Sequence, residues 1–206
     1  MKNICFVLIC LIGQLSTAQS VDYFVITKDD LKGLVDGKGN QVVKPMYDEI
    51  GDFDKEVKGW ARVAKDQKVG FIDRTGKEII KVEFDEVHPF GEYQKDWALV
   101  LKNGKSGFVT VNGNVIVPPK YDEIQKFNLV RKGWAKVRVD KNYGFITVGG
   151  SEIVPIKYHE IDNFNIYRKD LAVVKLDGKY GFININGEEA LAPQFDEIAP
   201  LTGEKK

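Results

Sequence analysis

Cysteine is scarce in this sequence and is confined to one end. The two cysteines, Cys5 and Cys10, lie in an apolar segment near the N-terminus. Beyond residue 10 the chain can therefore form no disulfide, has no thiol nucleophile and offers no thiolate to a metal. We do not expect Cys10 to carry a lipid, because the preceding Ile9 is bulky where such sites have a small residue.

Net charge is also absent. The 30 lysine and arginine side chains balance 30 aspartate and glutamate side chains. A chain without an excess of positive charge lacks the electrostatic signature of nucleic-acid binding, so we predict no nucleic-acid partner. With 43% hydrophobic and 29% charged residues, the composition is that of a soluble globular protein rather than a disordered one.

Catalytic signatures are missing as well. The chain has two histidines, His88 and His159, and no phosphate loop or HExxH motif. The segment 104–107 contains a serine between glycines but lacks the Gly-x-Ser-x-Gly spacing of a nucleophile elbow. We therefore assign no catalytic residue, no cofactor, no cofactor-binding residue and no metal ligand, and we predict that the protein is not an enzyme.

The first eighteen residues have the order of a secretory signal. Lys2 lies in a short polar start, an apolar run covers residues 4–13, and the small residues Ser16 and Ala18 precede Gln19. The run is shorter than the ~20 residues that span a bilayer. We predict a signal peptide at residues 1–18 and a periplasmic or extracellular mature chain without a transmembrane segment. The alternative is an ordinary buried first strand.

The rest of the chain is built on a period of 37 residues, without insertion or deletion. A core glycine recurs at Gly33, Gly70, Gly107, Gly144 and Gly181. A second glycine recurs at Gly39, Gly76, Gly113, Gly150 and Gly187. An aromatic residue recurs at Tyr47, Phe84, Tyr121, Tyr158 and Phe195. We therefore place five repeats within residues 19–206, at 23–59, 60–96, 97–133, 134–170 and 171–206.

Turn dipeptides divide each repeat into three antiparallel strands. Asn103-Gly104 marks a first turn and Asn112-Gly113 a second, and both pairs suit a type I′ turn, which needs positive φ at two residues. In the second repeat the predicted strands are 60–65, 68–74 and 77–84. The fold class is all-β, a tandem array of five three-stranded antiparallel meanders.

Both faces of each predicted sheet are apolar, one bulky and one small. In the second repeat the bulky face carries Trp60, Phe71, Ile80 and Phe84. The small face carries Ala61, Val63, Gly70, Ile72 and Ile79. Such a sheet has no face suited to water, so we expect the bulky face of one repeat to pack on the small face of the next. The strand glycine is expected to allow this close approach. The array could be an open twisted stack, which we favour, or a closed ring of five blades.

These residues resemble a known family. The segments 134–137 (Trp-Ala-Lys-Val), 143–146 (Tyr-Gly-Phe-Ile) and 180–183 (Tyr-Gly-Phe-Ile) are similar to the pattern of the bacterial WG-repeat family, also written WG-containing or KWG-type β-repeats. The resemblance covers about 21–201. The residue before the core glycine is never tryptophan here. The resemblance implies β-repeats in variable number, with no enzymatic activity and no defined ligand.

Three repeated columns are candidate sites. In four repeats an aspartate precedes a glutamate, at Asp48, Asp85, Asp122 and Asp196. In the fourth repeat His159 holds the position of this aspartate. The carboxylates could bind calcium or a basic partner, but we favour a turn role in which each Asp accepts backbone N–H groups. The second column, Trp60, Trp97 and Trp134, could stack on a ligand, but we favour packing beside Phe71, Phe108 and Phe145. The third is a basic stripe of Lys58, Lys95, Arg131, Lys132, Arg168 and Lys169, which we expect to be solvated or to form a weak contact surface.

Repeat arrays build wide surfaces without a deep pocket. We therefore hypothesise an exported, non-enzymatic scaffold that binds a protein or another component of the cell envelope. One alternative is an exported glycan hydrolase that uses two carboxylates. Another is a passive structural spacer, which the sequence does not separate from a scaffold.

Processing at the predicted site is directly testable. We expect the exported protein to begin at Gln19, because cleavage follows the small pair at 16 and 18. N-terminal sequencing of protein recovered from the periplasm or medium measures this. Substitution of Ala18 by a bulky residue should leave uncut precursor, whereas substitution of Gln14 should not. Recovery of an uncut wild-type chain in the cytoplasm would contradict the prediction.

Overall fold

The computed structural model describes residues 22–201 and contains nineteen strands in five separate antiparallel sheets. The first sheet contains β1 (Tyr23–Lys28), β2 (Leu31–Asp36) and β3 (Gln41–Tyr47). The second contains β4 (Glu49–Ile50), β5 (Trp60–Lys65), β6 (Lys68–Asp73) and β7 (Glu78–Phe84). The third contains β8 (Glu86–Val87), β9 (Trp97–Lys102), β10 (Lys105–Thr110) and β11 (Val115–Tyr121). The fourth contains β12 (Glu123–Ile124), β13 (Trp134–Val139), β14 (Asn142–Thr147) and β15 (Glu152–Tyr158). The fifth contains β16 (Glu160–Ile161), β17 (Leu171–Leu176), β18 (Lys179–Asn184) and β19 (Glu189–Phe195).

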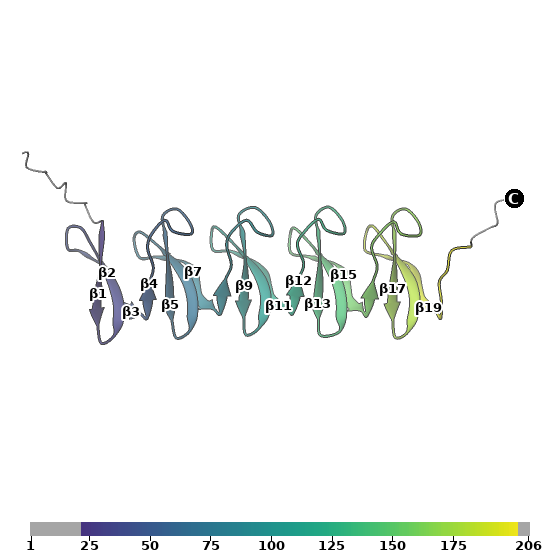
Figure 1. The fold of residues 1–206 in the computed structure, drawn as a ribbon, viewed down its shortest axis with the longest axis horizontal. Helices are drawn as coiled ribbons and strands as arrows, with labels where there is room; N and C mark the ends of the chain where they lie inside the picture. Colours follow the sequence, from purple (N-terminus) through teal and green to yellow (C-terminus); the bar gives the residue numbers. More distant parts are fainter. Residues whose placement is uncertain (1–21, 202–206) are drawn as a thin grey trace, which may run out of the picture.

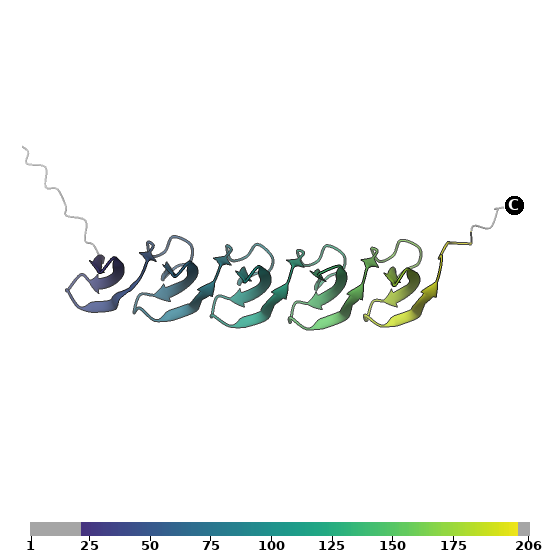
Figure 2. The same cartoon turned by 90° about the horizontal axis from the view of Figure 1, so that it is seen from below.

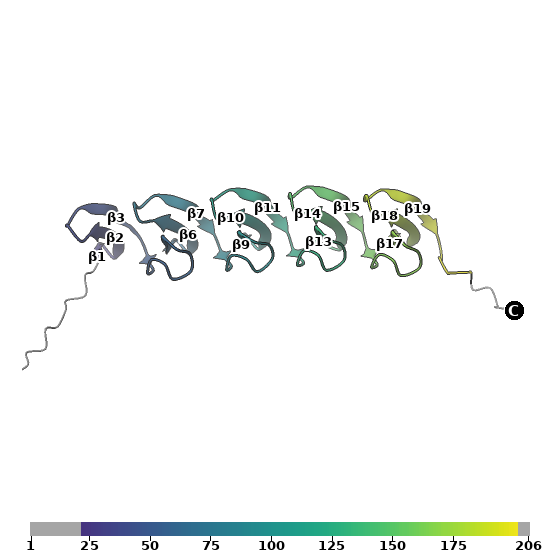
Figure 3. The ribbon, with the colours of Figure 1, turned by 90° about the horizontal axis from the view of Figure 1, so that it is seen from above.

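The five sheets stand in an open row. Figure 1 shows them side by side with the first and fifth sheets at opposite ends. Figure 2 shows the same row from below and Figure 3 shows it from above. The all-β array and the open stack are confirmed, and the closed ring is wrong. The described residues contain no helix that could cross a membrane. The predicted signal peptide at 1–18 lies outside the described residues, and the unit boundaries remain a prediction.

A two-residue strand links each sheet to the next. After β3 the chain passes Asp48 and forms β4, which pairs with β5 of the following sheet through Glu49↔Ala64 and Ile50↔Val63. The same crossing occurs at β8, β12 and β16. Every sheet after the first therefore receives its first strand from the sequence unit before it. This strand was not predicted, because its pairing partner lies in another repeat.

The first turn of each repeat is the predicted tight hairpin. Asn103 and Gly104 have φ of 53° and 71°, and Asp177 and Gly178 have φ of 49° and 79°, as a type I′ turn requires. The prediction is confirmed at this column.

The second turn differs from the prediction. Gly113 has φ of 79°, but Asn112 is not at positive φ, and the Thr110 amide donates to Asn114 O across three residues. This is the three-residue hairpin loop that ends in a left-handed glycine, so the predicted type I′ turn is wrong. In the second repeat Asp73 Oδ1 holds the loop by accepting the backbone N–H groups of Thr75 and Lys77.

The third strand of each repeat is bulged. In the second sheet Phe71 pairs with Ile80 and Ile72 with Glu78, which leaves Ile79 as an extra residue. A bulge turns such a residue out of the regular alternation of faces. The Ile79 carbonyl instead approaches Gly113 of the next repeat. The predicted place of Ile79 on the small face is therefore wrong.

The hydrophobic core lies between consecutive sheets. One cluster joins Leu34, Val43 and Tyr47 of the first sheet to Ala61, Val63 and Ile72 of the second. The next joins Phe71, Ile80 and Phe84 of the second sheet to Ala98, Val100 and Val109 of the third. Ala61 and Ile72 are 0% exposed, and Phe71, on the opposite face, is 1% exposed. The prediction that a bulky face packs on the next small face is confirmed.

The two glycine columns serve different contacts. A β-carbon at Gly70 would lie 2.5 Å from Ile80 O, on the neighbouring strand of the same sheet. The core glycine thus accommodates the bulged strand, and its predicted role in packing between repeats is wrong. The turn glycines make that contact: at Gly150 a β-carbon would lie 2.6 Å from Ile116 O of the preceding repeat. Only glycine allows both the positive φ and this approach.

A pair of substitutions isolates the contact between repeats. Gly39 and Gly113 have φ of 86° and 79°, but a β-carbon meets nothing within 4 Å at Gly39 and overlaps Ile79 O at Gly113. Gly39→Ala should cost about 1–2 kcal/mol from backbone strain alone. Gly113→Ala should cost about 1–3 kcal/mol more, as overpacking does. Urea unfolding of both variants measures the difference, and equal losses would contradict the assignment.

Candidate binding surface

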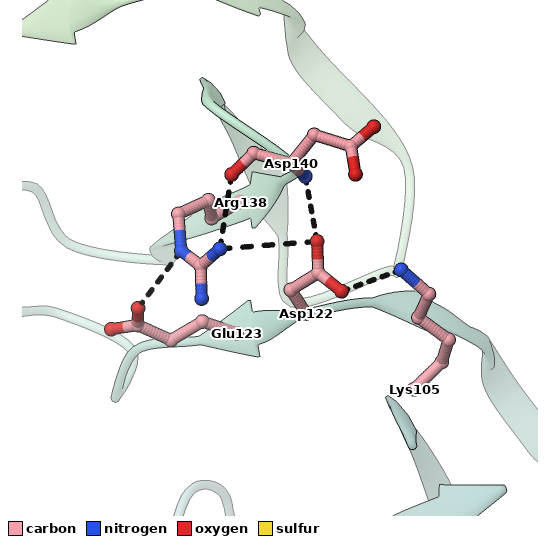
Figure 4. A network of polar contacts seen from close by, with 5 residues as sticks. All are labelled: Lys105, Asp122, Glu123, Arg138 and Asp140. Atoms are coloured by element: carbon pink, nitrogen blue, oxygen red, sulfur yellow. Dashed lines mark hydrogen bonds and ion pairs between the residues drawn. The ribbon is translucent and has the colours of Figure 1, made fainter. Parts of the chain in front are cut away.

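The acidic column occupies the crossings between sheets. Asp122 lies between β11 and β12, and Lys105 Nζ of the same repeat donates to its Oδ1 (Figure 4). The Asp140 amide, in the first turn of the following repeat, donates to its Oδ2 at 2.6 Å. Arg138 Nη1 lies 3.9 Å from that oxygen, and its Nε donates to Glu123 at 3.3 Å. Asp122 therefore ties one repeat to the next.

The same contacts recur along the row, with two informative departures. Lys68 binds Asp85, Lys179 binds Asp196, and the Asp66 amide donates to Asp48 at 2.7 Å. Leu31 takes the lysine place beside Asp48. In the fourth repeat Asn142 takes the lysine place and His159 the aspartate place, and His159 Nε2 lies 4.0 Å from Asp177 Oδ1 of the next turn. In the fourth repeat the lysine and the aspartate are therefore both replaced.

These contacts determine the charge state of the column. Lys105, and after it the Asp140 amide, hold the pKa of Asp122 below its ordinary value. Lys68, followed by the Asn103 and Gly104 amides, lowers the pKa of Asp85 in the same way. The expectation that each Asp accepts turn N–H groups is confirmed for Asp48, Asp85 and Asp122, with the correction that the turn belongs to the next repeat. Among residues 22–201, no three His, Cys, Asp or Glu residues cluster in a way that could hold a metal ion.

A second polar contact between repeats joins the aromatic column to a glutamate. Tyr158 OH donates to Glu189 at 2.8 Å, and Tyr47 OH and Tyr121 OH make equivalent bonds to Glu78 and Glu152. Burial and then Glu78 raise the pKa of Tyr47 to about 12. Phe84 has no hydroxyl, and the residue 31 positions after it is Val115 instead of glutamate. This pairing was not predicted from the sequence, although the constant spacing of 31 residues between tyrosine and glutamate could have revealed it.

The tryptophan column packs rather than forming a ligand strip. The rings of Trp60, Trp97 and Trp134 lie 5.8, 5.5 and 5.5 Å from Phe71, Phe108 and Phe145, as expected. A second ring from the following connection meets each tryptophan edge-on, at Phe90, Phe127 and Phe164. This further column also recurs every 37 residues and was not singled out in the sequence.

A cavity of about 240 Å³ breaks the repeat symmetry beside the second sheet. Its lining includes Glu49, Glu56, Trp60 and Arg62. Beside the third sheet the place of Glu56 is held by Tyr93, whose ring packs 5.3 Å from Phe108. The Arg62 guanidinium lies 3.4 Å from Glu56, so this acid is paired with a base. Pockets for drug-sized ligands are typically 300–1,000 Å³, which makes this cavity a weak candidate for such a site.

Exposed apolar side chains gather on one long edge of the row. We call the connections 51–59, 88–96, 125–133 and 162–170, with the adjacent second turns, the loop edge (Figure 1, top). In the last two connections Leu129, Ile166 and Tyr167 are 66%, 56% and 53% exposed. Val148 in the neighbouring second turn is 39% exposed, and its amide donates to Gly133 O.

Part of the basic stripe lies among these apolar residues. Lys132, Arg168 and Lys169 are exposed, while Arg131 is half-buried with its guanidinium 5.3 Å from the Trp134 ring. We call these residues together with Leu129, Val148, Ile166 and Tyr167 the apolar–basic patch. The first two connections lack it, since Lys55 and Glu92 stand at the place of Leu129 and Ile166.

The Asp122 contact predicts acid-sensitive stability. A carboxylate with a lowered pKa stabilises the fold above its unfolded pKa, near 3.9, and loses this contribution as pH falls through the lower folded value. Asp122→Asn should therefore lower the Tm by a few degrees at pH 7 and flatten its fall below pH 4. Asp196→Asn, which lies after the fifth sheet and joins no two sheets among the described residues, should change the Tm little. Melting curves followed by circular dichroism across pH test this, and equal effects would contradict it.

Solved structures show only distant likeness. The dihydro-heme d1 dehydrogenase NirN matches with a TM-score of 0.29 at 12% identity, over 86% of this chain and 45% of that one. Hsv2 proteins from two Kluyveromyces species, marxianus and lactis, match with TM-scores of 0.28 and 0.26 at 11% and 12% identity. These matches cover 89% and 81% of this chain, and 61% and 59% of the Hsv2 chains. The chain thus spans about half the length of these proteins, and such scores support no inference. No curated protein matches, and the hydrolase alternative gains no support.

The profile of one family matches nearly the whole described chain. It describes the WG containing repeat and aligns five times in tandem, at residues 33–68, 70–105, 107–143, 143–180 and 180–204. These five matches follow the 37-residue period, and each begins in the second long strand of a sheet, which confirms the predicted resemblance. The chain belongs to the WG-containing repeat family.

Proposed function

We propose that this protein is an exported, non-enzymatic scaffold that binds a partner protein through the apolar–basic patch of its loop edge. The observation that carries the proposal is the exposure of Leu129, Ile166 and Tyr167 on neighbouring connections of a rigid row. Apolar side chains that gather on a surface, rimmed by charge, are typical of protein-binding sites. Membership of a repeat family supports a binding role, because repeat arrays offer wide surfaces.

The chemistry of the patch indicates the kind of partner. Lys132, Arg168 and Lys169 follow the exposed apolar residues along the same two connections, and Asp170 ends the last connection. A complementary surface would carry carboxylates around apolar or aromatic anchors, since opposite charges steer association and apolar anchors supply affinity. We therefore propose an acidic protein segment that lies across the third and fourth connections.

The place of action follows from the first eighteen residues. Their polar start, apolar run and small pair support export, so the partner would be found in the periplasm, at the cell surface or outside the cell. A non-enzymatic role fits the recurrence of the carboxylate contacts at successive crossings, where Asp85 and Asp122 both bind lysine.

Two matched variants test the patch. Ile166→Asp with Lys169→Glu should weaken retention of envelope proteins by the immobilised protein roughly tenfold or more, because both an anchor and a charge are lost. Lys55→Asp with Lys58→Glu changes the same two places of the first connection and should leave retention unaltered. Quantitative mass spectrometry of the retained proteins measures both, and melting curves check folding.

Two results would count against the proposal. Wild-type protein that retains nothing above the background of uncoated resin has no partner in the envelope extract. Equal losses in the two variants would show that binding depends on overall charge rather than on this patch.

A further inference from the structure

As far as residues 22–201 show, the first sheet lacks a strand that every later sheet has. In the third sheet, for example, the Asp85 amide donates to Leu101 O and the His88 amide to Leu99 O, both at the edge of β9. The first sheet has three strands, and β1 pairs only with β2. Within residues 22–201, the carbonyls of Val25 and Thr27 at the same places on β1 therefore receive no crossing strand. Free strand edges are templates for pairing with another chain.

The outward face of the first sheet is apolar and open. Phe24 is 51% exposed, whereas Ala61 and Ala98 at the same place in the next two sheets are 0% exposed. A hollow of about 470 Å³ lies beside it, and its lining includes Ile26, Thr27 and Gln41. In the second sheet the corresponding residues are Val63, Ala64 and Glu78, which contact Ile50, Glu49 and Tyr47 of the preceding repeat. The hollow therefore lies at the place where the second sheet receives its crossing strand.

The other end of the row presents a crossing segment without a receiving sheet. Residues 196–198 are Asp-Glu-Ile, as at 48–50 and 122–124, but in the described residues they belong to no strand. Phe195 is 43% exposed, while Tyr121 and Tyr158 at the same place are 0% and 1% exposed. Asp196 already binds Lys179, as Asp122 binds Lys105.

We propose that these two ends bind each other, so that residues 195–199 of one copy occupy the hollow of the first sheet of a second copy. The new junction would repeat the internal ones: the Asp196 amide donates to Thr27 O, the Ala199 amide donates to Val25 O, and Ile198 packs on Ile26. Continuity with four internal junctions of the same kind is the reason for choosing a second copy as the occupant.

Side chains at the two ends support the fit. On the receiving face, Phe24 stands where the inner repeats have a smaller alanine. On the docking side, Leu171 stands where the inner repeats have tryptophan, and Leu201 stands where they have phenylalanine. The turn that would donate to Asp196 begins at Asp29. At the same place in later repeats, the Asp66 backbone amide donates to Asp48 and the Asp140 backbone amide donates to Asp122. A contact between two different surfaces leaves one surface of each kind free on a dimer, so further copies would add head to tail.

Sedimentation velocity of the purified protein, with and without residues 1–18, tests the assembly. The average mass of the form without residues 1–18 should rise steadily with concentration and show no fixed endpoint. Ile198→Asp, which changes only the terminal segment, should weaken association about tenfold or more, because a buried isoleucine becomes charged. Val115→Glu changes an exposed apolar residue elsewhere to the glutamate that Glu78 and Glu152 hold at the same place, and it should have no effect on association.

Mixing two blocked variants gives the sharper test. Ile198→Asp retains a receiving site, and Ile26→Asp retains a docking segment, so each alone should stay monomeric and the equimolar mixture should form only heterodimers. If Ile26→Asp does not fold by circular dichroism, Phe24→Asp takes its place. Four results would overturn the proposal: a monomeric wild-type protein at all concentrations, association that Ile198→Asp leaves unchanged, a mixture that stays monomeric, or a receiving site covered by residues 1–21 of the same chain.

Discussion

Burial of both faces of each inner sheet is the constraint on which this structure depends. A sheet such as the second, with Ile72 on one side and Phe71 on the other, cannot leave either face in water without a large cost. Each hydrophobic core is therefore formed by two consecutive sheets, and no sheet has a core of its own. Cooperation between neighbours is a physical requirement here, as in other repeat proteins whose units contact only their neighbours.

Apolar burial alone would not fix how neighbouring sheets align, because it has no direction. The crossing strands supply direction through two backbone hydrogen bonds at each junction, such as Asp122 to Arg138 O and Gln125 to Lys136 O. Asp122 then links a lysine of one repeat to a turn amide of the next. The turn glycines allow the backbones to touch. Together these contacts give every junction the same register, which explains why the row in Figure 1 is regular.

Much of the fold was accessible from the sequence because its signals are local or periodic. The period of 37 residues, the alternation along the long strands and the Asn103-Gly104 turn led to the strands and to the packing of unlike faces. The errors have physical causes. An Asn-Gly pair also fits a three-residue loop, and only the side chain before the loop, such as Asp73, favours that form. The bulge at Ile79 and the crossing strand at Glu49–Ile50 depend on partners that a local pattern does not specify.

The row also has a mechanical consequence. β1 and β19 lie at opposite ends of the row, so tension applied between them passes through all four junctions in series. Each junction offers a two-residue strand pair and one apolar interface, whereas each sheet is held by complete ladders between its long strands. A stretched molecule would thus part first at a junction and expose the core that two sheets share. A repeat that has lost its neighbours would then unfold, so the row would lengthen in steps and act as an extensible tether.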